Sequence, residues 1–298
     1  MRHLKSVLFR WFLFPLLLAT VTLAACGSED PAAKKTLVIG GIPDQDQSVL
    51  VRRFGGVADY LGRRLDVSVR YVPSIDYSAV VVGFKGGDIH LAWFGGLTGV
   101  QARGAVDGAL AVAQRPRDEQ FRSVFILRQG IDAQSLGDLK GLTFTFGSES
   151  STSGHLMPRY FLTEAGIDSE EDFNGLPNFS GSHDKTWKLV EAGAFQAGAL
   201  NEAVWDRAVA QGNVDLGKVR VLQVTEPYFD YNWSLRPDLD RQFGNGFTRK
   251  LSLALLEMHQ DAESTEVLGL FQADRFIETN NDNYRQIESV ARGLGLVE

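Results

Sequence analysis

The sequence is poor in cysteine, histidine and methionine, and this scarcity excludes several kinds of site. Its 298 residues include one cysteine, five histidines and three methionines. One cysteine cannot form a disulfide within the chain, and the scattered histidines lack the paired spacing of a metal site. The G-x-x-x-x-G-K-[ST] pattern of nucleotide-binding ATPases is missing as well. We therefore expect neither a metal nor a cofactor.

Basic residues are also in the minority. The chain has 30 lysines and arginines against 37 aspartates and glutamates, which gives a formal net charge of −7. No cluster of basic residues interleaved with aromatics occurs, so nucleic acid is not an expected partner. A bound anion would have to be held by local dipoles, such as the N-termini of helices.

The N-terminus has the pattern of a secretion signal. Three basic residues within the first ten precede an apolar run at residues 11–25, which is too short for a comfortable membrane span. The run closes with Leu23-Ala24-Ala25-Cys26, which resembles the lipobox of bacterial lipoproteins, whose cysteine is lipidated. We expect a signal peptide with lipobox at residues 1–26 and a polar tether at residues 27–35. The alternative is a buried or incidental cysteine.

The folded body begins near Thr36 with alternating strand and helix patterns. Residues 77–84 are ambiguous, because three consecutive valines favour a strand while the position between two strands favours a crossover helix; we assign a helix. The β-α-β-α-β order predicts a parallel sheet covered on both faces. The predicted strands of this first run are residues 36–40, 67–72, 89–94, 110–113 and 122–127, and its helices are residues 49–65, 77–84 and 97–103.

A second run of the same kind follows. The chain is long enough for two lobes or for one large domain, and two separate α/β runs favour two lobes. The remainder, from Phe247 onward, is predicted to be helical. The predicted strands of the second run are residues 142–146, 176–180, 196–200 and 219–224, and its helices are residues 156–165, 184–192 and 205–211.

Small hydroxylated residues stand where the strand at residues 142–146 turns into the next helix. Ser151, Thr152 and Ser153 are placed at the N-terminus of that helix, where unpaired backbone N–H groups and the helix dipole favour an anion. A tetrahedral oxyanion suits such a site. The alternative is that one of the serines is an ordinary N-cap. In open α/β sheets, ligands bind outside the carboxyl ends of the strands, where aromatic, hydroxyl and amide groups dominate here.

Four motifs resemble those of the substrate-binding proteins of phosphonate, phosphite and related ABC transporters: residues 87–96, 150–158, 180–184 and 198–201. The stretch at residues 228–233 is closest to the branch labelled selenate-binding. The resemblance implies an α/β two-lobe periplasmic-binding-protein fold of type II. Its hinge would have two crossings, near residues 129–136 and 225–230. Lobe 1 would comprise residues 36–128 and 229–298, and lobe 2 residues 129–228.

The resemblance also implies a function. The protein would be a lipid-anchored, monomeric solute-binding protein of an ABC importer, on the extracytoplasmic face of the membrane or in the periplasm. It would capture a phosphonate, phosphite, selenate or selenite-like oxyanion in the interlobe cleft and deliver it to a permease.

Site residues are carried over by position. Ser151, Thr152 and Ser153 would bind the oxyanion through hydroxyls and backbone N–H groups. The other positions are Tyr77 and His183 as donors, Asn201 as a polar contact, and Phe94 where some phosphonate binders have a tyrosine, so that one donor is missing.

Each of these positions has a plainer alternative. His183 could be a solvated neighbour of a helix cap, and Tyr77 could belong to the core; for Trp93 we prefer the core, and we expect His155 at the surface. Asp230 could be a turn residue after Pro227 or face the cleft. We hypothesise that one of Asp44, Asp46 and Asp230, with Asp230 favoured, accepts a hydrogen bond from a protonated ligand.

Two other functional classes were considered. A hydrolase would use Ser151 or Ser153 with His183 and Asp184, but no G-x-S-x-G elbow surrounds these serines, and an adjacent aspartate does not orient a histidine usefully. We therefore expect no enzyme. A lipid-anchored protein without a transport role would not need a hydroxyl-rich helix start that faces a hinge.

Overall fold

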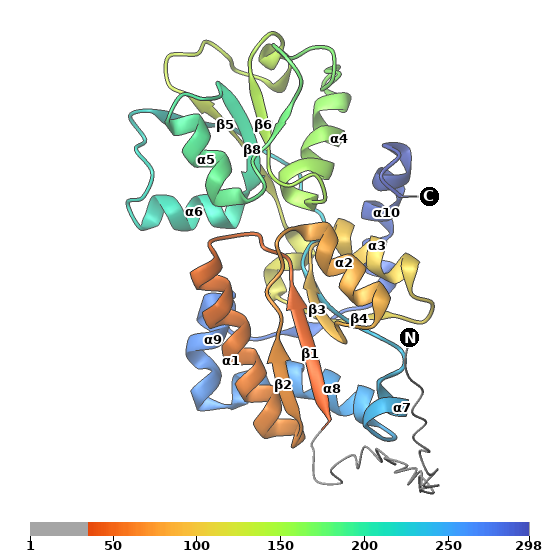
Figure 1. The fold of residues 1–298 in the computed structure, drawn as a ribbon. Coiled ribbons are helices and arrows are strands. Elements are labelled where there is room, and N and C mark those ends of the chain that lie inside the picture. The colour runs from red at the N-terminus through yellow and green to blue at the C-terminus, as the bar shows by residue number, and fades with distance from the viewer. Residues whose placement is uncertain (1–34, 298) are drawn as a thin grey trace, which may run out of the picture. The chain divides into compact units, whose positions relative to one another are not determined.

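The computed structural model describes residues 35–297. The predicted secretion signal, Cys26 and the tether up to residue 34 lie outside the described residues. Two β-sheets, each with its own helices, make up this part of the chain (Figure 1). None of its helices combines the length and the apolar character that crossing a membrane requires.

The first sheet has six strands in the order β11-β4-β10-β3-β1-β2. The strands β1, β2 and β3 are parallel, whereas β10 lies antiparallel between β3 and β4. The prediction of a purely parallel sheet was therefore wrong, because β10 and β11 enter it from the C-terminal part of the chain. The bounds are β1 Thr36–Gly41, β2 Ser68–Tyr71, β3 Leu91–Phe94, β4 Leu110–Gln114, β10 Asn232–Leu235 and β11 Ile277–Glu278.

Helices cover both faces of the first sheet. The ambiguous segment forms helix α2, as predicted: Asp76 caps it by accepting from the N–H of Ala79 at 2.7 Å, and Val80 and Phe84 are buried on one side. Figure 1 shows α1 and α9 on one side of the sheet and α2 and α3 on the other. The bounds are α1 Gln47–Leu65, α2 Tyr77–Gly86, α3 Gly96–Ala105, α7 Leu239–Phe243, α8 Phe247–Leu256, α9 Thr265–Leu270 and α10 Arg285–Gly293.

The second sheet has five strands in the order β7-β6-β8-β5-β9. Strand β5, which the sequence placed in the first run and in lobe 1, pairs antiparallel with β8 and β9. That assignment was wrong, and the first crossing between the sheets precedes β5 instead of following it. The bounds are β5 Ser123–Arg128, β6 Phe144–Phe146, β7 Asn178–Phe179, β8 Ala197–Asn201 and β9 Val219–Val224, with helices α4 Met157–Glu164, α5 His183–Glu191 and α6 Glu202–Ala210.

Burial explains why β5 is a continuous apolar run. Phe125 and Leu127 pack into one cluster with residues of α4, while Val124 and Ile126 pack into another with residues of α5 and α6. Successive side chains of a strand point to opposite faces, so a strand covered on both faces has no polar side. Each fully buried side chain of this size contributes about 1.5–3 kcal/mol to folding.

Two segments connect the sheets, residues 115–122 and 225–231, and they are hydrogen-bonded to each other. The backbone groups of Phe121 and Tyr228 exchange two hydrogen bonds, of 2.8 and 2.9 Å. Beside them the N–H of Asp230 donates to the carbonyl of Asp118 at 3.1 Å. The first connection contains the short 3-10 helix η1 Pro116–Gln120; further short turns are η2 Leu136–Leu139, η4 Met258–Gln260, η5 Ala262–Ser264 and η6 Asn281–Tyr284.

Candidate functional site

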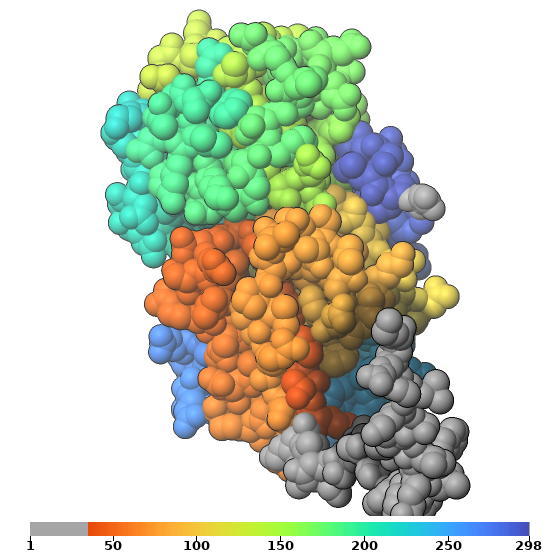
Figure 2. All heavy atoms as spheres, viewed as in Figure 1, coloured from red at the N-terminus to blue at the C-terminus, as the bar shows by residue number. Residues whose placement is uncertain are grey.

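Six helical segments begin just beyond the carboxyl ends of strands, and the first turns of several of them meet in a buried region between the sheets. The first N–H groups of a helix have no intrahelical acceptor, so such starts concentrate hydrogen-bond donors and positive potential without cationic side chains. The residues that precede these starts are Asp46, Asp76, Gly95, Ser151, Ser182 and Asn201. We call the first sheet with its helices the first half, and the second sheet with its helices the second half. Figure 2 shows the orange surface of the first half in direct contact with the green surface of the second half.

The hydroxylated stretch opens with a π-helical turn, η3 Thr152–Leu156, that continues into α4. Ser151 caps it, since its Oγ accepts from the N–H of Gly154 at 3.0 Å, so the N-cap interpretation holds for this residue. Thr152 contacts helix α3, which packs on the first sheet, because its Oγ1 accepts from the N–H of Leu97 at 2.9 Å. The hydroxyl of Ser153 is buried without a partner among the described residues.

His183 is the first residue of α5 and is 1% exposed, which excludes the solvated alternative. Its Nδ1 accepts from the N–H of Asn201 at 3.3 Å, so its ring hydrogen is on Nε2, 3.5 Å from the hydroxyl of Tyr231. Burial lowers the pKa of His183 to about 4, against a smaller opposing effect of Asp44 and Asp184. The imidazole is therefore a neutral hydrogen-bond donor at neutral pH.

Asp230 is buried and caps a helix. Its Oδ1 accepts from the N–H of Gly96 at 2.8 Å, at the start of α3, and its Oδ2 has no partner among the described residues. Burial raises its pKa to about 7, although the N–H of Gly96 and the nearby hydroxyls of Thr152 and Ser153 act in the opposite direction. Asp230 is thus not a solvated turn residue, and its carboxyl takes up a proton close to neutral pH.

The remaining predicted positions differ in what they can offer. The hydroxyl of Tyr77 is buried without a partner in the described part of the chain, and burial raises its pKa well above the usual value. The amide of Asn201 is engaged, accepting from the N–H of Val204 at 3.1 Å and donating to Tyr231 at 3.1 Å. Phe94 is fully buried against Phe84, with ring centres 5.5 Å apart, and supplies an apolar wall.

Sequence reasoning missed Tyr231 and left Asp44 undecided. Tyr231 joins Asn201 and His183 of the second sheet and stacks on Trp93 of the first, 5.6 Å between ring centres. Asp44 is 2% exposed, 3.6 Å from a guanidinium nitrogen of Arg53. Tyr231 lay within the motif at residues 228–233, and its aromatic hydroxyl there was the available signal.

His155 and Trp93, which neighbour the site in the sequence, are both buried. The expectation that His155 lies at the surface was wrong: it is 3% exposed, between the rings of Phe146 and Phe179. Its Nδ1 donates to the carbonyl of Glu149 at 2.7 Å, while its Nε2 is buried without a partner among the described residues. The expectation that Trp93 belongs to the core is confirmed by its burial among other aromatic rings.

The geometry does not support hydrolysis. A serine nucleophile needs a base within hydrogen-bonding distance. Ser151 is paired with Gly154, while the two nitrogens of His183 face Asn201 and Tyr231. Over residues 35–297, no group of three histidine, cysteine, aspartate or glutamate side chains could hold a metal ion.

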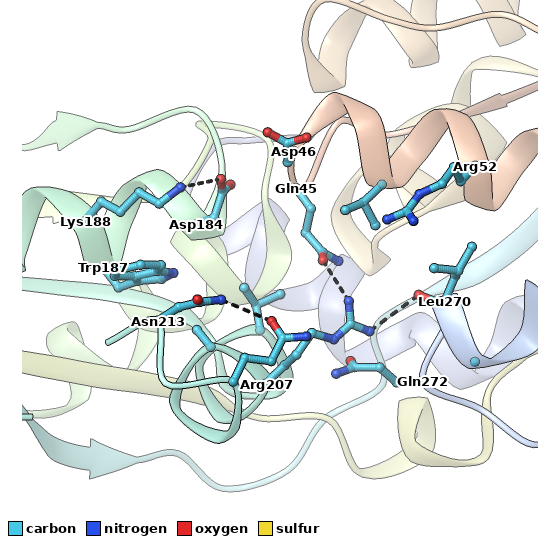
Figure 3. A pocket seen from close by; sticks show the side chains of 15 residues that line it. Gln45, Asp46, Arg52, Asp184, Trp187, Lys188, Arg207, Asn213, Leu270 and Gln272 are labelled. Atoms are coloured by element: carbon cyan, nitrogen blue, oxygen red, sulfur yellow. Dashed lines mark hydrogen bonds and ion pairs between the residues drawn. The ribbon is translucent and has the colours of Figure 1, made fainter. Parts of the chain in front are cut away.

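A cavity of about 740 Å³ lies beside this region (Figure 3). It is lined by α1 and the end of α9 from the first half and by α5 and α6 from the second. Of the residues considered for a site, Asp46 and Asp184 line it. The hydroxyl-lined region and this cavity are therefore distinct parts of the boundary between the sheets.

Solved structures with the same architecture define the class of protein. PhnD1 from Prochlorococcus marinus (MIT 9301), in complex with methylphosphonate, matches with a TM-score of 0.85 at 42% identity, over 88% of this chain and 99% of that chain. A binding protein component of an ABC phosphonate transporter from Pseudomonas aeruginosa matches with a TM-score of 0.76 at 19% identity, over 86% and 85% of the two chains. The predicted two-lobe periplasmic-binding-protein fold is confirmed.

Sequence comparison gives the family. The family profile described as "ABC transporter, phosphonate, periplasmic substrate-binding protein" matches residues 39–284. The probable ABC transporter phosphite binding protein PhnD1 of Prochlorococcus marinus is 42% identical over 270 residues, 88% of this chain and 91% of the relative. The chain belongs to this family of periplasmic substrate-binding proteins of phosphonate ABC transporters. The narrower selenate-binding branch stays a prediction.

Proposed function

We propose that this chain captures a small tetrahedral oxyanion between its two sheets and delivers it to the permease of an ABC importer. The observation that carries the proposal is a set of buried polar atoms at the strand ends without partners among the described residues. They are the hydroxyls of Tyr77 and Ser153 and Oδ2 of Asp230. An unpaired buried polar group costs about 1–3 kcal/mol, so a ligand that pairs all three is favoured.

The stretch from Ser151 to Ser153 supplies further donors besides the unpartnered hydroxyl of Ser153. A hydroxyl that accepts from a backbone N–H keeps its own hydrogen free to donate. Ser151 and Thr152 are both in this situation. Together with Ser153, the neutral His183 and the N–H groups at the start of η3, they make a cage of neutral donors for an anion.

The ligand we favour is a protonated oxyanion such as a phosphonate or phosphite. Asp230 is a carboxyl with one oxygen free, and an acceptor of this kind profits from a P–O–H group on the ligand. Selenate and sulfate carry no proton at neutral pH, so the ionised form of Asp230 and the nearby Asp44 would repel them, and only the protonated form of Asp230 could donate to them. The complex of the 42% identical relative with methylphosphonate agrees with this preference.

Capture requires the two sheets to move apart and close again. We assign residues 36–114 and 232–297 to one lobe and 123–224 to the other, with the hydrogen-bonded connections as the hinge. Contacts such as Leu97 to Thr152 and Gly96 to Asp230 would then form on closure. The chain is expected to act as a monomer.

The anchor assignment rests on the sequence alone. We propose that the protein is held at the extracytoplasmic face of the membrane by a lipid on Cys26. Cells that express the full chain should incorporate labelled palmitate into it, and Cys26→Ser should abolish the labelling. An unmodified cysteine in the secreted product would contradict the anchor.

The oxyanion site is tested by replacing Ser151, Thr152 and Ser153 together with alanine. Calorimetry with methylphosphonate, phosphite, phosphate, sulfate, selenate and selenite should show saturable binding of the protonated oxyanions by the parent chain. The triple variant should lose it, since each charge-assisted hydrogen bond contributes about 1.5–3 kcal/mol. Ser252→Ala, on α8 in the first half, is the control. Unchanged affinity in the triple variant would remove the central claim, and selenate as the best ligand would overturn the preference.

A further inference from the structure

The cavity in Figure 3 lies outside the oxyanion site. The N–H of His183 donates to the carbonyl of Asp44 at 3.2 Å, and this contact joins the two halves between the hydroxyl cage and the cavity. The cavity, of about 740 Å³, has the size of pockets that enclose small organic ligands. We propose that it is a second ligand site, for a small zwitterion that carries a carboxylate and an ammonium group, such as an amino acid or a dipeptide.

Two cationic side chains in this cavity lack an acidic partner. Arg207 donates to Oε1 of Gln45 at 3.3 Å and to the carbonyl of Leu270 at 3.5 Å, both close to the limit for a hydrogen bond. Arg52 lines the cavity and makes no ion pair with any described residue. Figure 3 shows the guanidinium of Arg207 in the middle of the cavity, with Arg52 above it. These two groups offer a site for a carboxylate.

Two acidic groups line the same cavity. Oδ1 of Asp46 accepts from both the N–H and the hydroxyl of Ser48, at 2.9 and 2.6 Å, and the carboxylate has no ion-pair partner in the described part of the chain. Asp184 is 3.5 Å from the ammonium of Lys188, a long ion pair. A ligand ammonium can therefore approach two carboxylates whose charge is weakly compensated.

A buried indole adds a further donor. Trp187 lines the cavity at 6% exposure, and its Nε1–H has no partner among residues 35–297. In Figure 3 the nitrogen edge of the ring points toward the middle of the cavity. The ammonium of Lys188 lies 5.3 Å from the ring centre on its face. Because the ring is buried, the indole can move little without exposing apolar area. Its N–H is therefore held in place and available to an acceptor.

The mixture of charges selects the ligand class. A simple anion is attracted by Arg52, Arg207 and Lys188 but repelled by Asp46 and Asp184, and for a simple cation the signs are reversed. A zwitterion satisfies both sets at once. Val49, Val204 and Leu270 supply apolar surface for its carbon skeleton.

Lining residues come from both halves, so the site is complete only when the halves are in contact. A ligand in the cavity would favour the closed form. By linkage, the cavity ligand would increase the affinity for the oxyanion by some factor, and the oxyanion would increase the affinity for the cavity ligand by the same factor. Binding at the cavity does not rest on the proposed function; only this coupling does.

The test is a titration with β-alanine and glycylglycine, followed by tryptophan fluorescence and calorimetry, without and with saturating methylphosphonate. We expect saturable binding in both conditions, at least about fivefold tighter when methylphosphonate is present. Acetate and methylammonium should not bind. Arg52→Gln and Asp184→Asn should each weaken zwitterion binding about tenfold, the effect of one charge-assisted hydrogen bond. Arg63→Gln, on the same helix but paired with Asp261, is the control.

The proposal is overturned if neither zwitterion binds, if acetate or methylammonium binds as well as they do, or if both variants bind like the parent chain. Competition between the zwitterion and methylphosphonate would overturn it too, by placing both ligands in one site. If methylphosphonate fails to bind while the zwitterion binds, the proposed function fails and the second site stands.

Discussion

Asp230 shows how one buried carboxyl links the site to stability. Its pKa is raised to about 7 from 3.8, chiefly by burial, so the folded chain keeps a proton that the unfolded chain loses. The contribution is therefore fully favourable below about pH 4 and is lost as the pH rises to 7, a change of about 4 kcal/mol. In Asp230→Asn, unfolding by urea between pH 4.5 and 7.5 should lack this decline. Asp107→Asn, at an exposed position, should retain it, and a parallel decline in Asp230→Asn would refute the assignment.

The contribution of His155 to stability has the opposite pH dependence. Burial between two phenylalanine rings lowers its pKa to about 4. The unfolded chain therefore binds a proton near pH 6.5, whereas the folded chain binds it only near pH 4. Stability from this residue is present above pH 6.5 and decreases by about 2 kcal/mol between pH 6.5 and 5. We predict that His155→Phe has a shallower loss of unfolding free energy over this interval, measured by urea titration. An unchanged slope would show that His155 does not carry this part of the acid sensitivity.

At the scale of elements, the hydroxylated turn depends on a glycine. A Cβ on Gly154 would lie 2.9 Å from Oγ of Ser151 and 3.0 Å from Cε1 of His183, two groups of the proposed cage. Gly154→Ala should therefore weaken oxyanion binding about tenfold or more while the chain still folds, because displacement by a few tenths of an ångström misaligns several donors. Gly104→Ala, within α3 with open space around it, should bind normally and gain about 0.5–1 kcal/mol of stability. Equal affinity in the two variants would contradict this role.

The elements also show what the sequence could and could not predict. The helix start at Ser151 was predictable because its signal is local: a strand that ends at Phe146, small hydroxyl residues directly after it and Pro158. The sheet to which β5 belongs was not, since a strand buried on both faces has the same apolar pattern in either sheet. Strand β10 has four residues, all buried, too few for a period to be recognised. Tyr231 meets His183 only through this topology, which spacing along the chain does not encode.

For the whole molecule, we predict that ligand changes the distance between the sheets. Closure forms contacts such as that between Leu97 and Thr152, so the closed form is favoured by an amount that depends on the ligand. Small-angle scattering should show a smaller radius of gyration with methylphosphonate than without it. The triple alanine variant at residues 151–153 should show no such change. An equal radius of gyration of the parent chain with and without methylphosphonate would contradict hinge closure.

The pairing of Phe121 with Tyr228 has a consequence for how the gene could be rearranged. Because the chain leaves the first sheet and returns to it through two adjacent, hydrogen-bonded segments, residues 123–224 form an insert whose ends lie side by side. An insert with neighbouring ends can be exchanged as a cassette without rerouting the host. One half of the donor cage, including Ser151 and His183, would travel with the cassette, while Tyr77 and Asp230 would stay with the host. New ligand preferences could then arise when a different cassette is combined with the same host, whose site residues Tyr77 and Asp230 would be unchanged.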